Sequence, residues 1–145
     1  MKRLSALCIL FTIFMCFSAG TALAEATVPD LTGTWATKSY SHHHEKQGFF
    51  SNPDVDGQWI IKKQQGRLFH GERSYTMKQI STEKITEGFS GVISKDGNRL
   101  YMVDHDEDIL FGEILSNGLI ELIMINDGDK NNHSKIGLME IERVK

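Results

Sequence analysis

The chain has 145 residues, of which 40% are hydrophobic and 24% charged, and its formal net charge at pH 7 is −3. That length is typical of a single domain. The balance of 16 Lys and Arg against 19 Asp and Glu excludes a basic nucleic-acid-binding protein, and the apolar content excludes a disordered chain.

The first 24 residues have the three parts of a secretory signal peptide. Lys2 and Arg3 precede an apolar run over Leu4–Phe17, and Ala22 and Ala24 supply the small residues of a cleavage site. The run of about 14 residues is shorter than the ~20 that a membrane-spanning helix needs. We therefore predict a signal peptide over 1–24, one domain over 25–145, no membrane span, and a secreted or periplasmic location.

Both cysteines, Cys8 and Cys16, lie within the predicted signal peptide. The predicted domain is therefore free of cysteine. Packing and hydrogen bonds alone would stabilise it, which about 120 residues can achieve with a single core.

Short segments rich in Ile, Val, Phe, Tyr and Trp follow one another along the predicted domain, as expected for β-strands. They are separated by turn sequences such as Gln65-Gly66, Asp96-Gly97 and Asn117-Gly118. The eight predicted strands are Thr34–Ser41, Gln58–Gln64, Leu68–Ser74, Phe89–Ser94, Leu100–His105, Ile109–Leu115, Leu119–Ile125 and Lys135–Val144.

The last two segments differ in pattern. In Lys135–Val144, Gly137, Met139 and Ile141 fall on one face at period two. In Leu119–Ile125 only Glu121 is polar, so this strand is either covered on both faces or carries an apolar outer face. The segment Thr76–Thr86 is a poor helix former, and we expect a loop, a short turn or an irregular extension of a hairpin.

Eight strands joined mostly by short turns predict an all-β fold, an eight-stranded antiparallel meander that closes into a β-barrel. Closure removes the two unpaired edges that an open meander would expose. Such a barrel is filled by its own side chains or holds one small ligand. The alternative is a two-sheet sandwich, which usually needs longer crossing connections.

The stretch Leu31-Thr32-Gly33-Thr34-Trp35 resembles the first strand of avidin-type and lipocalin-type barrels, the calycin group. The resemblance implies that Trp35 plugs one end of the barrel and that a late basic residue, Arg143, packs over it. Ser41 matches a biotin-contacting Ser of avidin-type barrels in spacing, but Thr37 stands where those proteins have Asn. The resemblance therefore implies a barrel but not biotin as its ligand.

His42, His43 and His44 form the most unusual local feature. On a strand His42 and His44 would share a face, as chelation of a metal requires, but a solvated polar loop is the simpler explanation. We predict no functional metal site and no cofactor, and the role of these residues stays open.

The acidic turn over 104–108 lacks the spacing of a calcium loop. No Gly-x-Ser-x-Gly elbow is present, and Glu113 and Glu121 fit outward-facing surface charge. The prediction is therefore a binding protein and not an enzyme, with no catalytic residues.

Ligand binding is predicted for Tyr40, Trp59, Tyr101 and His105, because pockets combine aromatic surface with a few polar groups. Tyr101 and His105 share a face at period two, and this face is the lumen only if the strand parity is right. Phe69 and Phe111 are expected to be core residues. The predicted partner is a small, partly apolar ligand, with no nucleic acid and with the oligomeric state open.

The competing hypothesis is an exported interaction protein, such as a periplasmic protease inhibitor, whose barrel is filled and whose loops carry the function. The predicted loop over 41–57, with Phe49 and Phe50 at its centre, favours this alternative because paired exposed aromatics often mark a partner surface. An outward-facing Tyr101 and His105 would strengthen it.

Overall fold

The computed structural model describes residues 27–52, 56–76, 83–105, 108–116, 118–128 and 133–145. The predicted signal peptide and most of the segment Thr76–Thr86 lie outside the described residues. Every regular element in the described ranges is a β-strand. The strands are β1 (Gly33–His44), β2 (Gly48–Asn52), β3 (Gly57–Gln65), β4 (Leu68–Thr76), β5 (Lys84–Ile93), β6 (Arg99–Asp104), β7 (Ile109–Ser116), β8 (Leu119–Asn126) and β9 (Lys135–Arg143).

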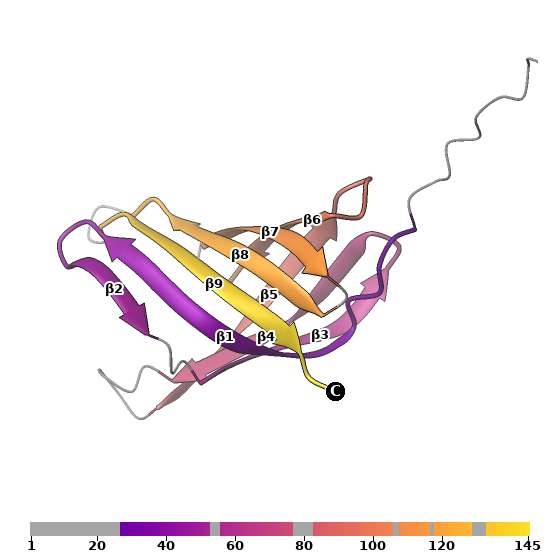
Figure 1. Ribbon diagram of the computed structural model, residues 1–145, viewed down its shortest axis with the longest axis horizontal. Helices are drawn as coiled ribbons and strands as arrows, with labels where there is room; N and C mark the ends of the chain where they lie inside the picture. The colour runs from indigo at the N-terminus through magenta and orange to yellow at the C-terminus, as the bar shows by residue number, and fades with distance from the viewer. Residues whose placement is uncertain (1–26, 53–55, 77–82, 106–107, 117, 129–132) are drawn as a thin grey trace, which may run out of the picture.

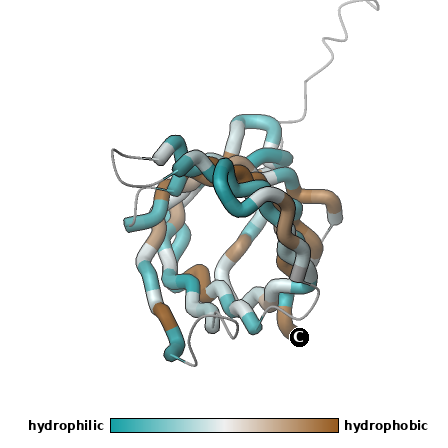
Figure 2. Tube along the Cα trace, turned by 90° about the vertical axis from the view of Figure 1, so that its left-hand side faces the viewer, coloured by the Kyte–Doolittle hydropathy of each residue, from teal (hydrophilic) through white to brown (hydrophobic). Residues whose placement is uncertain are grey.

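Eight of these strands form a closed antiparallel barrel, as predicted. Neighbours along the chain pair with one another from β3 to β9, and β1 closes the ring by pairing with both β3 and β9. β2 is an additional strand outside the ring (Figure 1), paired with the second half of β1. Figure 2, turned by 90°, shows the strands arranged around a common axis.

The presence of β2 shows that the loop predicted over residues 41–57 is wrong. β1 continues as a strand through the three histidines, so that His42 pairs with Phe50 and His43 with Phe49. β1 thus extends beyond its contact with β3, which ends at Ala36, and its free edge is covered by β2. Pairing with β1 makes a strand of Gly48–Asn52.

Tight turns with glycine at positive φ connect several hairpins. Gly66 has a φ of 58° and Gly97 a φ of 76°, a region that residues with a Cβ rarely adopt. These turns follow the Gln-Gly and Asp-Gly signals in the sequence. Asp56-Gly57 is also an Asp-Gly sequence, but Gly57 begins β3 and pairs with Tyr75.

The core lies inside the ring, where alternate residues of each strand meet. Its members include two tryptophans and two phenylalanines, each at most 5% exposed: Trp35, Trp59, Phe69 and Phe89. β9 points inward the face that carries Gly137, Met139 and Ile141, which the sequence places together without deciding its direction. β8 has an apolar outer face, since Ile123 and Ile125 are exposed, which decides between the two alternatives left open above.

Candidate functional site: the polar end of the barrel

One end of the barrel is closed by Trp35. Its side chain is 1% exposed, and its indole N–H donates to the carbonyl of Leu31 at 3.0 Å. The Arg143 guanidinium lies 4.6 Å from the indole ring centroid and donates to the carbonyls of Thr32 and Asp30. The contact between Trp35 and Arg143 that the calycin resemblance implied is therefore present.

The middle of the lumen is packed by aromatic rings that lie over glycines. A Cβ added at Gly91 would come within 2.4 Å of the Phe69 ring, and one added at Gly71 within 2.6 Å of the Phe89 ring. Real Cβ atoms do not approach so closely, so each glycine makes room for a ring. Trp59 packs against Phe89 with ring centroids 5.4 Å apart.

Further from Trp35, the inward-facing residues become polar. We call this region the polar end; it comprises Tyr40 and His42 of β1, Arg73 and Tyr75 of β4, Glu87 of β5, Asp104 of β6, Asp108, and Asn126 of β8. Along β4, for example, inward positions run from Phe69 through Gly71 to Arg73 and Tyr75. The lumen is thus apolar near Trp35 and polar at the opposite end.

Arg73 lies at the boundary between these two regions. It is 6% exposed, and its guanidinium forms ion pairs with Glu87 at 2.7 Å, Asp104 at 2.5 Å and Asp108 at 3.1 Å. The guanidinium also lies 5.6 Å from the Trp59 ring. Burial alone lowers the pKa of Arg73, but the surrounding carboxylates outweigh it and raise the pKa above its ordinary value.

Hydrogen bonds extend this network. The Tyr75 hydroxyl donates to Glu87 at 2.8 Å, and burial followed by this bond raises the pKa of Tyr75. The Asn126 amide donates to Asp108 at 2.8 Å, and the backbone N–H of Asp108 donates to the Asp104 carboxylate at 2.9 Å. A buried network of this kind holds its members in fixed positions.

Tyr40 and His42 stand beside the network with hydrogen-bonding capacity unused. Their ring centroids are 5.3 Å apart, and the His42 ring also lies 5.0 Å from Phe50. Nδ1 of His42 is buried and has no hydrogen-bond partner, and no described residue bonds the Tyr40 hydroxyl. Such an unsatisfied buried atom costs about 1–3 kcal/mol.

The protonation of both groups follows from their surroundings. Burial, assisted by the charge of Lys135, lowers the pKa of His42, which favours the neutral imidazole near pH 7. Burial and the nearby Asp108 raise the pKa of Tyr40 to about 12, so the phenol keeps its proton. At neutral pH the pair therefore presents a hydroxyl and a neutral ring nitrogen.

The four predicted ligand-binding residues do not converge in one lumen. Trp59 is buried inside the barrel and Tyr40 faces the polar end, as expected. Tyr101 is 40% exposed on the outer face, where it packs against Phe111, and His105 lies outside over Gly88. The expectation for Tyr101 and His105 depended on strand parity, and the observed register turns both outward.

Phe69 and Phe111 also have different locations. Phe69 is buried in the core as predicted, whereas Phe111 is 41% exposed, because β7 points Leu110 and Gly112 inward instead. Glu113 and Glu121 face outward on neighbouring strands, in agreement with the surface-charge interpretation.

The centre of the polar end is not among the predicted site residues. The sequence indicates an acidic turn over 104–108, yet Asp104 and Asp108 are buried against Arg73. The signal was the alternation in β4, which places Arg73 on the same face as Phe69 and Gly71. A charged residue on the buried face of a strand calls for buried partners of opposite charge.

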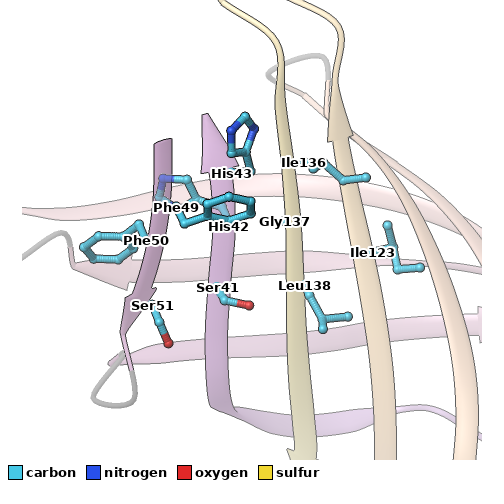
Figure 3. A pocket seen from close by; sticks show the side chains of 10 residues that line it. All are labelled: Ser41, His42, His43, Phe49, Phe50, Ser51, Ile123, Ile136, Gly137 and Leu138. Carbon is cyan, nitrogen blue, oxygen red and sulfur yellow. The ribbon is translucent and has the colours of Figure 1, made fainter. Parts of the chain in front are cut away.

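On the opposite, outer face of β1, β2, β8 and β9 lies an open groove of about 550 Å³ (Figure 3). Its lining includes Phe49, Ile123, Ile136 and Leu138 together with Ser41.

No group of three His, Cys, Asp or Glu residues suited to a metal ion occurs among the described residues. Nor does that part of the chain contain a helix long and apolar enough to cross a membrane.

Comparisons with known proteins give a fold but no family. No family model matches the chain, and no curated protein does. Among solved structures, the chain is similar to EF1p2_mFAP2b bound to DFHBI, with 13% identity, a TM-score of 0.56, and coverage of 79% of this chain and 94% of that one. It is also similar to a redesigned β-barrel, with 11% identity, a TM-score of 0.50, and coverage of 79% and 92%. At such low identity these similarities establish the barrel fold alone.

Proposed function

We propose that this chain is an exported, calycin-type barrel that binds a small, partly apolar ligand at its polar end. The observation that carries the proposal is the pair of unused hydrogen-bonding groups, the Tyr40 hydroxyl and the buried His42 Nδ1. A ligand that bonds His42 Nδ1 would recover the free energy that this unpaired buried atom costs, and the Tyr40 hydroxyl beside it could form a second hydrogen bond.

The surroundings of this pair suit a ligand with one polar group and an aromatic or aliphatic body. Phe50 lies beside His42, and the Tyr75 ring lies 5.4 Å from the Arg73 guanidinium. The fixed network around Arg73 supplies a rigid wall, which reduces the entropy lost on binding. The proposed role is binding and not catalysis.

The calycin assignment and the ligand-binding role draw further support from two sources. Arg143 packs over Trp35 as in the calycin group, and one of the barrels to which this chain is similar is bound to DFHBI. Biotin is not the proposed ligand, because Ser41 faces outward opposite Leu138. Export rests on the signal-peptide pattern over residues 1–24.

The test is a titration with N-phenyl-1-naphthylamine, a neutral aromatic amine whose fluorescence rises in apolar surroundings. A neutral probe is preferable because three carboxylates and one guanidinium lie at the polar end. Tyr40→Ala should weaken binding by about tenfold or more, which corresponds to at least ~1.4 kcal/mol. Tyr101→Ala is the matched control, since it removes the same side chain from the outer face, and should leave the affinity unchanged.

Absence of binding, or equal binding by the wild type and Tyr40→Ala, would refute the proposal. Loss of binding in Tyr101→Ala alone would assign the probe to the outer surface. The conservative variant Tyr40→Phe removes only the hydroxyl and keeps the ring. It therefore separates the loss of the hydrogen bond from a change in packing.

The interaction-protein hypothesis stays as the second candidate, and a specific observation favours it. Phe49 is 91% exposed on β2, and Tyr101 lies among other exposed hydrophobic side chains. Large exposed apolar patches mark interaction sites more often than ordinary surface.

A further inference from the structure

The charged side chains at the polar end are unequal in number. Asp104 and Asp108 are buried, and the Glu87 side chain is 9% exposed. All three carboxylates pair with the guanidinium of Arg73, which is the one buried Lys or Arg among the described residues. Because charges interact more strongly inside a protein than in water, this excess of carboxylates over guanidinium favours a cation nearby.

The excess negative charge acts at the place of the proposed ligand. Burial raises the pKa of Tyr40, and Asp108 raises it further by more than Arg73 lowers it. The pKa of Tyr75 is also raised, first by burial, and Glu87 outweighs Arg73 there. A phenol pKa that is raised by a neighbouring charge marks a position where negative charge is disfavoured. The electrostatic field at both hydroxyls therefore favours a positively charged group.

The unused hydrogen-bonding groups beside the network fit a ligand that donates hydrogen bonds. The neutral imidazole of His42 can accept a bond at Nδ1, and the Tyr40 oxygen can accept as well as donate. An ammonium group has only donors, whereas a carboxylate has only acceptors. An ammonium group can therefore bond both residues, and a carboxylate would add a further negative charge to the same place.

Aromatic rings at the polar end already hold a cation. The Arg73 guanidinium lies 5.6 Å from the Trp59 ring and 5.4 Å from the Tyr75 ring. The rings of Tyr40 and His42 form a second aromatic surface beside it, with Phe50 next to His42. The faces of such phenol and phenyl rings attract a cation.

We infer that the ligand of the polar end is a protonated amine attached to an aromatic or aliphatic body. The inference rests on the proposed function and specifies the charge of its ligand. The ammonium group donates to His42 Nδ1 and to the Tyr40 oxygen, in the field of Asp108, and the body of the ligand packs against Phe50.

Three naphthalene probes that differ in charge test the inference by calorimetry on the full chain recovered from an exporting host. At neutral pH naphthylethylamine is a cation, naphthylethanol is neutral and naphthylacetate is an anion. The amine should bind about tenfold or more tightly than the alcohol, and the acetate should bind more weakly than the alcohol.

Asp108→Asn removes one of the negative charges and keeps the size of the side chain. It should lower the ratio of amine to alcohol affinity by about threefold or more. Because a ratio is compared, a general change in packing that affects both probes cancels. Asp96→Asn is the matched control, since it removes the same charge from an exposed turn beside Pro29, near the Trp35 end, and should leave the ratio unchanged.

The possible outcomes separate the charge of the ligand from the binding role. Equal binding of the amine and the alcohol, or tighter binding of the acetate, overturns the inference and leaves the proposed function standing. An unchanged ratio in a folded Asp108→Asn variant, or an equal loss in Asp96→Asn, also overturns it. If Asp108→Asn does not fold, the three probes on the wild type decide alone. Absence of binding by all three probes refutes the proposed function itself.

Discussion

Replacement of Arg73 by methionine should destabilise the fold by about 3–5 kcal/mol, the usual cost of removing one partner from a buried ion pair. Arg73 is 6% exposed, and its guanidinium lies within 3.1 Å of carboxylate oxygens from Glu87, Asp104 and Asp108. Methionine fills much of the same volume, so the loss would come from the charge and its hydrogen bonds. Urea unfolding followed by circular dichroism measures this loss of stability. The urea concentration at the midpoint of unfolding should fall, while the dependence of the unfolding free energy on urea stays unchanged.

Arg99→Met is the matched control for this prediction. Arg99 also pairs with a carboxylate, that of Asp96 at 3.5 Å, but both side chains are largely exposed. Such a surface pair contributes about 0–1 kcal/mol. If Arg73→Met costs no more than Arg99→Met, Arg73 is not the centre of a buried network.

Three further substitutions test other parts of the structure. Trp35→Ala should cost about 3–5 kcal/mol in thermal unfolding, as large core truncations do; a loss below ~1 kcal/mol would mean that Trp35 does not close the barrel. Glu121→Lys should stabilise the fold by about 1 kcal/mol, because Glu121 lies directly opposite Glu113 and Glu140 and each like-charged pair becomes attractive; a lower melting temperature would contradict this. Burial lowers the pKa of His42 below its ordinary value of 6.5, so the unfolded chain binds protons that the folded one does not. The stability due to neutral His42 is therefore complete above that value and is lost as the pH falls through the folded pKa. In His42→Phe the slope of stability against pH below 6.5 should decrease, and an unchanged slope would refute the assignment.

Much of the barrel could be predicted because turns and strands carry local signals. Gln65-Gly66 and Asp96-Gly97 form turns where the sequence indicates them, and the strands flanking them follow. β2 could not be predicted in this way, since Gly48–Asn52 is a strand through its pairing with β1 outside the ring. The five residues of β2 contain no local pattern that indicates pairing with β1.

The candidate site was harder to predict because it depends on parity. Register shifts occur between Thr37 and Ser39 in β1 and between Ile61 and Lys63 in β3, and each changes which residues face inward. β6 has no such shift, yet Tyr101 faces outward because Leu100 and Met102 occupy the core. Leu100, Tyr101 and Met102 are too similar in hydrophobicity for this property alone to decide which face of β6 points inward.

Methyl NMR with N-phenyl-1-naphthylamine distinguishes the proposed binding inside the polar end from binding in the outer groove. The ε-methyls of Met124 and Met139 report on the lumen, where the Met124 sulfur lies 3.9 Å from the Arg73 guanidinium. The δ1-methyls of Ile123 and Ile136 report on the outer groove; Ile123 is next to Met124 on β8, and Ile136 is three residues from Met139 on β9. Binding inside the polar end should give large shifts for Met124 and small ones for Ile123 and Ile136. Shifts confined to the isoleucines, or none at all, would contradict it.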